Sequence, residues 1–160
     1  MPEKKSIGVL GAGSWGTALD THLASMGHEV SLWARRKEQA EDINASGENA
    51  KYLPGFKLPD SLNATNDLEK ALHNKSLVLS VVPSHTKREV WKDAAPYLSK
   101  GTPVLSASKG IENESLALMS TLLEELLPDN PLAFLAGPSF AKEVVQKLPT
   151  AVVIGSRSTE

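Results

Sequence analysis

Short apolar runs alternate with longer amphipathic stretches along the chain, and the two patterns predict strands and helices in turn. The apolar runs predict strands over residues 6–10, 29–33, 77–82, 103–107, 132–136 and 151–155. Between them, apolar residues recur every three or four positions, which is the spacing of an amphipathic helix. This spacing predicts helices over residues 14–26, 84–98 and 114–127. A polar helix over 35–46 and a short helix over 139–148 are expected as well.

The alternation of the two patterns predicts the fold class. Strands that are separated by helices indicate a parallel sheet, because a parallel connection has to cross back over the sheet. We therefore expect an α/β protein with a Rossmann-type, doubly wound, mostly parallel sheet and helices on both faces. In the helix over 84–98 we expect Val90 and Trp91 to be buried and Lys87 and Arg88 to face water.

Composition narrows the function classes. The chain has 160 residues, of which 41% are hydrophobic and 22% charged, and its formal net charge is −2. This length suits one domain, and the mixed charges lack the concentrated basic face of a nucleic-acid or membrane-surface binder. The sequence has no cysteine, so disulfides and thiolate metal sites are excluded, and no other metal site is predicted. The first apolar run is too short for a signal peptide or a membrane span, so we expect a cytoplasmic protein.

A glycine-rich turn carries the strongest local signal. The segment Gly-Ala-Gly-Ser-Trp-Gly directly follows the first predicted strand and opens the first predicted helix, the context that makes G-x-G-x-x-G specific. Gly11 permits the tight turn, Gly13 lets the backbone approach a pyrophosphate, and Gly16 lets the helix pack closely on the sheet. The amides of Ser14 and Trp15 would then meet the diphosphate. The alternative is a turn that merely needs small residues.

The end of the second predicted strand bears on the choice of dinucleotide. Sites that select NAD place an acidic residue there to bind the ribose 2′-hydroxyl. Here the strand ends in Trp33 and is followed by Ala34, Arg35 and Arg36, with no carboxylate. Two guanidinium groups can bind a 2′-phosphate through charge-assisted hydrogen bonds. We therefore expect NADP(H) to be favoured and NAD(H) to be accepted as well; an ordinary solvated helix start is the alternative.

Five segments together resemble one family. They are GAGSWGTAL at 11–19, LWARR at 32–36, VPSH at 82–85, SKGIE at 108–112 and AGPSFAKE at 136–143. In this order and spacing, over essentially the whole chain, they are similar to the bacterial NAD(P)-dependent glycerol-3-phosphate dehydrogenases. That family interconverts dihydroxyacetone phosphate and sn-glycerol 3-phosphate with NAD(P)H and feeds phospholipid synthesis.

The resemblance also implies site residues. Cofactor contacts are implied for Ser14, Trp15, Arg35, Arg36, Lys109 and Ala141, and for Tyr52 on a less motif-like loop. Substrate contacts are implied for Lys109, Gly137 and Ser139.

The residue chemistry is consistent with two of these roles. Lys109 follows the carboxyl end of a predicted strand, where open α/β sheets bind ligands, and its ammonium group can polarise a carbonyl or hold a phosphate. Without the resemblance, a solvated surface lysine would be the simpler interpretation. We expect Ser139 to cap the helix over 139–148.

The resemblance further implies that part of the enzyme lies outside this sequence. Members of the family are about twice this length, and a helical C-terminal domain supplies the general acid/base lysine and the residues that hold the substrate phosphate. We therefore expect residues 1–160 to form the NAD(P)-binding domain, with its polar ending at 155–160 close to the boundary with that second domain. No catalytic residue is assigned in this chain, which should bind cofactor but turn over negligibly, and the full-length enzyme is expected to be a homodimer.

Three other functions share some of these features. A ketopantoate reductase or a 6-phosphogluconate-type dehydrogenase would have the glycine turn, but neither is expected to carry both the SKGIE and AGPSFAKE segments. A non-catalytic NAD(P)-sensing module would keep the turn without needing Lys109 and Ser139 at the rim of the sheet. A purely structural α/β scaffold would need neither the turn nor the paired arginines.

Overall fold

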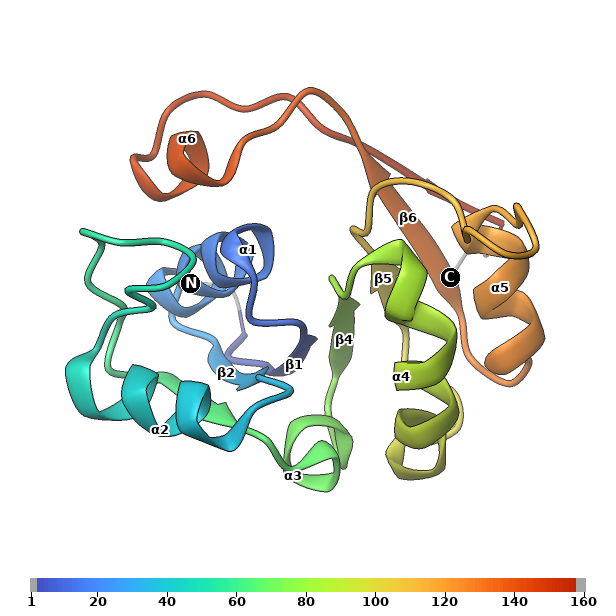
Figure 1. Ribbon diagram of the computed structural model, residues 1–160, viewed down its shortest axis with the longest axis horizontal. Coiled ribbons are helices and arrows are strands. Elements are labelled where there is room, and N and C mark those ends of the chain that lie inside the picture. Colours follow the sequence, from blue (N-terminus) through green and yellow to red (C-terminus); the bar gives the residue numbers. More distant parts are fainter. Residues whose placement is uncertain (1–2, 158–160) are drawn as a thin grey trace.

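The computed structural model describes residues 3–157, which form one sheet with helices on both faces (Figure 1). Within these residues the sheet has seven strands in the order β3-β2-β1-β4-β5-β6-β7. All neighbours pair in parallel except β7, which runs antiparallel to β6. The strands are β1 (Ser6–Leu10), β2 (Glu29–Trp33), β3 (Leu62–Thr65), β4 (Leu77–Ser80), β5 (Val104–Ser106), β6 (Leu132–Ala136) and β7 (Val153–Ser156). The predicted doubly wound, mostly parallel sheet is confirmed.

Two apolar clusters fill the space between the sheet and its helices. The helices are α1 (Ser14–Ser25), α2 (Lys37–Ser46), α3 (Leu68–Leu72), α4 (Lys87–Ala94), α5 (Met119–Leu126) and α6 (Ala141–Val145). One cluster joins β-strand residues to Ala24 of α1 and to Ala40 and Ile43 of α2. The other joins the sheet to α3, α4 and α5 and contains the fully buried Trp91. In Figure 1, α1 and α2 lie on one side of the molecule and α4 and α5 on the other.

Several predicted boundaries were wrong for local reasons. Strand β3 was not predicted, because it is a short edge strand in which polar and apolar residues mix. Helix α3, which has only five residues, was not predicted either. The predicted helix over 84–98 is divided into a 3-10 turn η1 (Ser84–Thr86), α4 and a second 3-10 turn η2 (Ala95–Tyr97), which contains Pro96. The predicted helix over 114–127 begins only at Met119, because Ile111 and Leu118 pair as an isolated antiparallel bridge.

The strand order places a crevice in the middle of the sheet. From β1 the chain continues outward to β2 and β3, and from β4 it continues in the opposite direction to β5 and β6. Ligands of such sheets bind outside the carboxyl ends of the strands at this switch point. Strand β1 ends at Leu10 and β4 at Ser80, so the segments that follow these two residues border the crevice.

The described residues stop short of both ends of the chain. Residues 1–2 and part of the polar ending predicted at 155–160 lie outside the described residues. Within residues 3–157 no helix has the length and apolar character required to cross a bilayer. Over the same range no three acidic or histidine side chains gather as a metal site would require.

Candidate functional site

The glycine turn between β1 and α1 has the close packing that its sequence predicts. Gly11 has φ of +120°, and a Cβ there would lie 2.9 Å from the carbonyl oxygen of Val81 on the neighbouring strand end. A Cβ at Gly16 would lie 1.8 Å from the carbonyl oxygen of Gly11. At Gly13, by contrast, a Cβ would meet no atom within 4 Å. The first and third glycines are therefore required by packing, while the second faces open space.

The start of α1 offers donors to an anion. The first backbone hydrogen bond of the helix runs from the amide of Thr17 to the carbonyl of Gly13, at 3.0 Å. The amides of Ser14 and Trp15 therefore precede the first intrahelical bond. No side chain caps this end, and its first turn has no acidic residue. An uncapped helix start next to an open glycine suits a phosphate group.

Two amide side chains, which were not predicted from the sequence, hold the turn in place. The carbonyl oxygen of Ala12 accepts from Gln39 Nε2 at 2.8 Å and from Asn49 Nδ2 at 3.0 Å. The buried Asn49 also donates to Thr17 Oγ1 at 2.8 Å. These contacts fix the turn from α2 and from the loop that follows α2. Neither residue belongs to a motif, so only the tertiary structure identifies them.

A cleft, which we call the arginine cleft, runs from the glycine turn to the end of β2. It is lined by Gly11–Gly13, Trp33, Arg35, Gln39, Tyr52, Val81–Pro83, Thr86 and Val90. The Arg35 guanidinium is largely exposed and lies 3.8 Å from Glu89. Tyr52 reaches the cleft from its loop, as the resemblance implies, but Arg36 lines a separate hollow beside α2. The structure therefore places one of the two arginines in the cleft.

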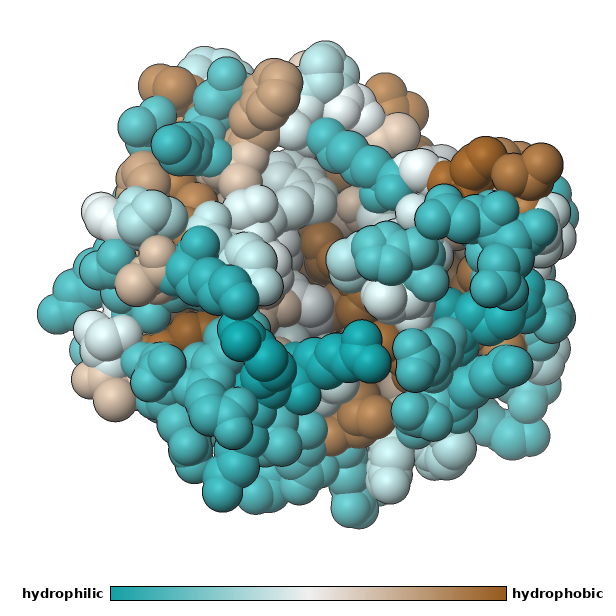
Figure 2. Space-filling view, in the orientation of Figure 1, coloured by the Kyte–Doolittle hydropathy of each residue, from teal (hydrophilic) through white to brown (hydrophobic). Residues whose placement is uncertain are grey.

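A second hollow, the lysine pocket, adjoins the arginine cleft and shares the Val81–Pro83 wall with it. Its lining is Ser14, Trp15, Val81–Pro83, Ala107–Lys109 and Ser139–Ala141. Lys109 Nζ donates to the Ser139 carbonyl at 3.0 Å and lies 5.4 Å from the centre of the Trp15 ring, a cation–π distance. The surface in Figure 2 is hollowed near its centre, with weakly polar and apolar residues inside and hydrophilic residues around.

Two predicted roles near β6 differ from what the structure shows. The prediction that Ser139 caps a helix over 139–148 was wrong: α6 spans Ala141–Val145, and its N-cap position is Phe140, whose extended backbone delays the helix start. Ser139 is buried, and its carbonyl rather than its hydroxyl meets Lys109. Gly137 does not line the lysine pocket; it has φ of +140°, and a Cβ there would lie 2.8 Å from the carbonyl oxygen of Ala151.

The prediction that Lys87 faces water was also wrong. Its side chain is fully buried, and Nζ donates to Ser106 Oγ at 2.5 Å and to Ser108 Oγ at 3.1 Å. Burial lowers the pKa of Lys87 from 10.5 to about 7, because the protein interior disfavours the charged amine. Lysines are rarely buried without a carboxylate, so the sequence favoured an exposed position.

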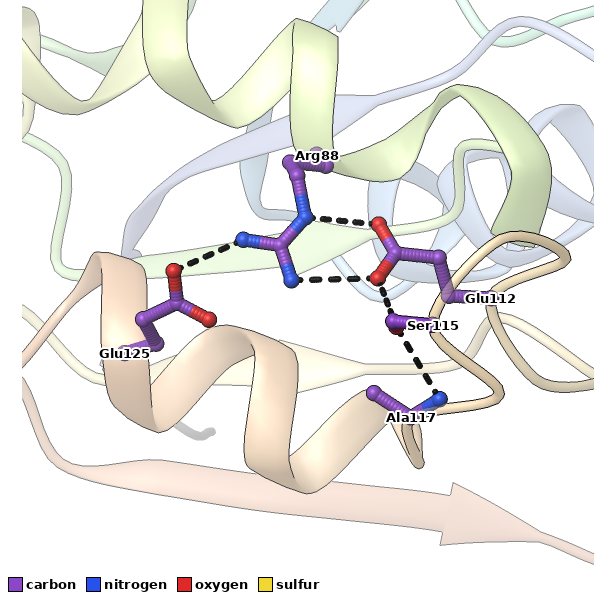
Figure 3. A network of polar contacts seen from close by, with 5 residues as sticks. All are labelled: Arg88, Glu112, Ser115, Ala117 and Glu125. Carbon is purple, nitrogen blue, oxygen red and sulfur yellow. Dashed lines mark hydrogen bonds and ion pairs between the residues drawn. The ribbon is translucent and has the colours of Figure 1, made fainter.

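Arg88, the next residue, anchors the loop that follows Lys109 (Figure 3). Its guanidinium donates to both oxygens of Glu112, at 2.7 and 3.0 Å, and to Glu125 of α5 at 2.8 Å. Ser115 Oγ also donates to Glu112, and it accepts from the Ala117 amide at 3.2 Å. The hydrogen bonds from Arg88 and Ser115 hold the pKa of Glu112 below its ordinary value. Arg88 is thus only partly exposed, contrary to the prediction that it faces water.

Comparisons with known proteins agree with this geometry. The family model for the N-terminus of NAD-dependent glycerol-3-phosphate dehydrogenase matches residues 6–160. A glycerol-3-phosphate dehydrogenase [NAD(P)+] from Desulfotalea psychrophila is 47% identical over 97% of this chain and 48% of that protein. One from Leptospira biflexa is 45% identical over 95% of this chain and 46% of that protein.

A solved structure gives the same result for the fold. The glycerol-3-phosphate dehydrogenase of Coxiella burnetii superimposes with a TM-score of 0.91 at 37% identity, covering 98% of this chain and 48% of that one. The chain spans about half the length of the curated relatives it matches. The match over nearly the whole chain sets aside the other dehydrogenase families considered from the sequence. The chain belongs to the family of NAD-dependent glycerol-3-phosphate dehydrogenase N-terminal domains.

Proposed function

We propose that this chain is the cofactor-binding part of an enzyme that interconverts dihydroxyacetone phosphate and sn-glycerol 3-phosphate with NAD(P)H. The observation that carries the proposal is the uncapped start of α1 above an open Gly13, at the switch point of the sheet. The names of the relatives, which include both glycerol-3-phosphate and NAD(P)+, support the same reaction. As the family resemblance implies, the full-length enzyme would be a cytoplasmic homodimer that serves phospholipid synthesis.

The groove formed by the arginine cleft and the lysine pocket gives the cofactor a direction. We assign the adenosine ribose to the side of Arg35 and Tyr52, and the pyrophosphate to the amides of Ser14 and Trp15. The nicotinamide end then lies toward Pro83 and the lysine pocket. Arg35 supports a preference for NADP(H), because its exposed guanidinium can form charge-assisted hydrogen bonds to a 2′-phosphate.

Lys109 is the group in this chain best placed to meet the substrate. The bound cofactor supplies the hydride that reduces the ketone carbon. Lys109 Nζ uses one N–H on the Ser139 carbonyl, which leaves two donors for a phosphate or a carbonyl oxygen in the lysine pocket. The general acid/base lysine is expected in the remaining length of the enzyme. We therefore propose that this chain alone binds cofactor with negligible turnover, and dehydrogenase activity from the 160 residues would contradict this.

Titration of the chain with NADPH and, separately, NADH tests the cofactor assignment. Both should bind saturably, with NADPH tighter. R35Q should weaken NADPH binding about tenfold, the equivalent of one lost hydrogen bond to a charged group, and should leave NADH nearly unchanged. K37Q is the matched control, because Lys37 is a neighbouring exposed cation that lines neither part of the groove. Failure of both nucleotides to bind would contradict the proposed function, whereas an equal loss of affinity for both in R35Q would contradict only the role of Arg35.

A further inference from the structure

We propose that Lys87 is a positioning residue that holds the Ser108–Lys109 segment against the Val82–Pro83 wall and so sets the shape of the lysine pocket. The inference rests on the proposed function, because it assigns that pocket to the nicotinamide end of the cofactor. Lys87 does not line the pocket itself. It acts through Ser108, which does.

The burial of the Lys87 amine costs more free energy than a purely structural role would explain. The side chain is completely buried on the inward face of α4. Within residues 3–157 its Nζ has no carboxylate partner at ion-pair distance, and its hydrogen bonds go to the hydroxyls of Ser106 and Ser108. A buried amine without an acid is harder to accommodate than an apolar side chain of similar volume. The position is therefore explained by what the amine holds.

The hydrogen bonds of Lys87 continue to the opposite wall of the pocket. Because Ser108 Oγ accepts from Lys87, its own hydrogen is free to be donated, and the nearest acceptor is the Val82 carbonyl at 2.6 Å. Ser108 and Val82 both line the lysine pocket. A chain of hydrogen bonds thus leads from α4 through the end of β5 to the end of β4.

This chain of hydrogen bonds lies just beyond the point where the backbone ladder between β4 and β5 ends. The ladder between β4 and β5 ends with the pair Ser80 and Ser106, followed by one bond from the Ala107 amide to the Ser80 carbonyl at 3.0 Å. Beyond Ala107 the contact between the walls is made by Ser108 with the carbonyls of Ser80 and Val82. Lys87 orients the Ser108 hydroxyl for that contact.

The far side of Lys109 is held from the same helix. Arg88, which follows Lys87 in α4, binds Glu112, three residues beyond Lys109 (Figure 3). Between them, Gly110 has φ of +102°, and a Cβ there would lie 3.2 Å from Ser84 Oγ. Two successive residues of α4 therefore fix both ends of the segment that carries Lys109, with Lys87 on the pocket side.

Two nucleotides of different length separate a positioning role from a general loss of stability. NADPH should span the arginine cleft and the lysine pocket, whereas adenosine 2′,5′-bisphosphate should reach only the arginine cleft and the start of α1. We expect K87M to weaken NADPH binding about 5-fold, the equivalent of one hydrogen bond, and to change the affinity for adenosine 2′,5′-bisphosphate less than about twofold. K92M is the matched control, because Lys92 is an exposed lysine of the same helix. It should change neither affinity.

A double-mutant cycle with Ser108 tests the route through which Lys87 acts. S108A should weaken NADPH binding in the same selective way. The double variant K87M/S108A should bind NADPH no more weakly than whichever single variant binds it less tightly. S106A, which removes the other acceptor of Lys87, provides a second variant if K87M does not fold. It should show a smaller loss for NADPH only.

The outcomes are distinguishable. Equal losses for both nucleotides, or no loss for either, would overturn the positioning role of Lys87 while wild-type binding still supported the proposed function. Additive effects of K87M and S108A would also overturn it. Failure of the wild-type chain to bind both NADPH and NADH would instead overturn the proposed function, and the inference with it.

Discussion

The backbone of Gly16 lies so close to the carbonyl oxygen of Gly11 that a Cβ on Gly16 would be 1.8 Å from it. This contact presses the first turn of α1 onto the end of β1. The middle glycine of the same turn, Gly13, has open space where its Cβ would be. Packing and ligand approach are thus assigned to different glycines, which two substitutions can separate.

We expect G16A to destabilise the fold and G13A to impair binding alone. G16A should lower the free energy of unfolding by on the order of 3 kcal/mol, because the added methyl group meets backbone that cannot yield easily. G13A should keep the free energy of unfolding within about 1 kcal/mol of wild type while weakening NADPH binding roughly tenfold, because its methyl group projects toward the anion site. Urea unfolding and NADPH titration measure the two effects. G155A, at an open glycine far from the turn, is the control. Normal NADPH affinity in G13A would contradict the placement of the pyrophosphate.

Replacing Asp20 should stabilise the protein. Its carboxyl group is fully buried in α1, and neither oxygen has a hydrogen-bond partner. We expect D20A to raise the free energy of unfolding at pH 7 by on the order of 1–3 kcal/mol, because an unsatisfied buried polar group is removed. The exposed Asp93 gives the control variant D93A.

The gain from D20A should depend on pH. Burial raises the pKa of Asp20 well above its ordinary value of 3.8. At a pH between the ordinary pKa and the raised pKa, the folded protein holds a proton on Asp20 that the unfolded chain has lost. Wild-type stability therefore falls as the pH rises through this range. The advantage of D20A should therefore be larger at pH 7 than near pH 4. Urea unfolding at pH 7 and at pH 4 checks this. A stability advantage of D20A that is equal at the two pH values would mean that the buried carboxyl group has an ordinary pKa.

Lys87 should leave a signature at higher pH. Its pKa is about 7 in the folded protein, against 10.5 for an ordinary lysine. Over that interval the unfolded chain binds the extra proton, so wild-type stability should rise with pH by up to about 1.4 kcal/mol per unit. K87M lacks this contribution, so its stability relative to wild type should decline steadily from pH 7 to pH 10. Urea unfolding of both proteins, with K92M alongside, is the measurement. A constant difference would show that the buried amine keeps its proton.

The ion pair between Arg88 and Glu112 should stabilise the protein at neutral pH and cease to do so in acid. Arg88 lowers the pKa of Glu112 from its ordinary 4.5, so the contribution is present above pH 4.5 and is lost as the pH falls through the folded value. We expect R88M to lower the melting temperature at pH 7 and to approach wild type below pH 4.5. R157M, which breaks an exposed pair with Glu124, should have little effect at either pH. A difference between R88M and wild type that persists in acid would point to packing rather than charge.

The sequence predicted the parts of the site that local chemistry determines. The glycine turn and the position of Lys109 follow from strand ends and short motifs, and the structure places the turn at the switch point and Lys109 in the pocket beside it. The burial of Lys87 also had a signal, because it lies three, four and seven residues before Val90, Trp91 and Ala94, on the apolar face of α4. The prediction placed Lys87 in water because lysines are usually exposed, and so did not follow that spacing.

Other features depend on tertiary contacts and had no local signal. Asn49 belongs to a loop without a motif and gains its role only by reaching Ala12, 37 residues earlier. The start of α6 was misplaced because a serine after Gly-Pro resembles a cap, whereas the extended backbone at Phe140 carries the chain further.

The two side-chain hydrogen bonds to the Ala12 carbonyl have a consequence for the order of folding. The turn is held by Gln39 and Asn49, which lie 27 and 37 residues away along the chain. Contacts at such separations form after local ones, because closing a long loop costs entropy. We therefore expect the glycine turn to become rigid only when β1, α1, β2, α2 and the loop after α2 have assembled. The acquisition of nucleotide binding during refolding would then mark a late step, although the turn is among the first segments in the sequence.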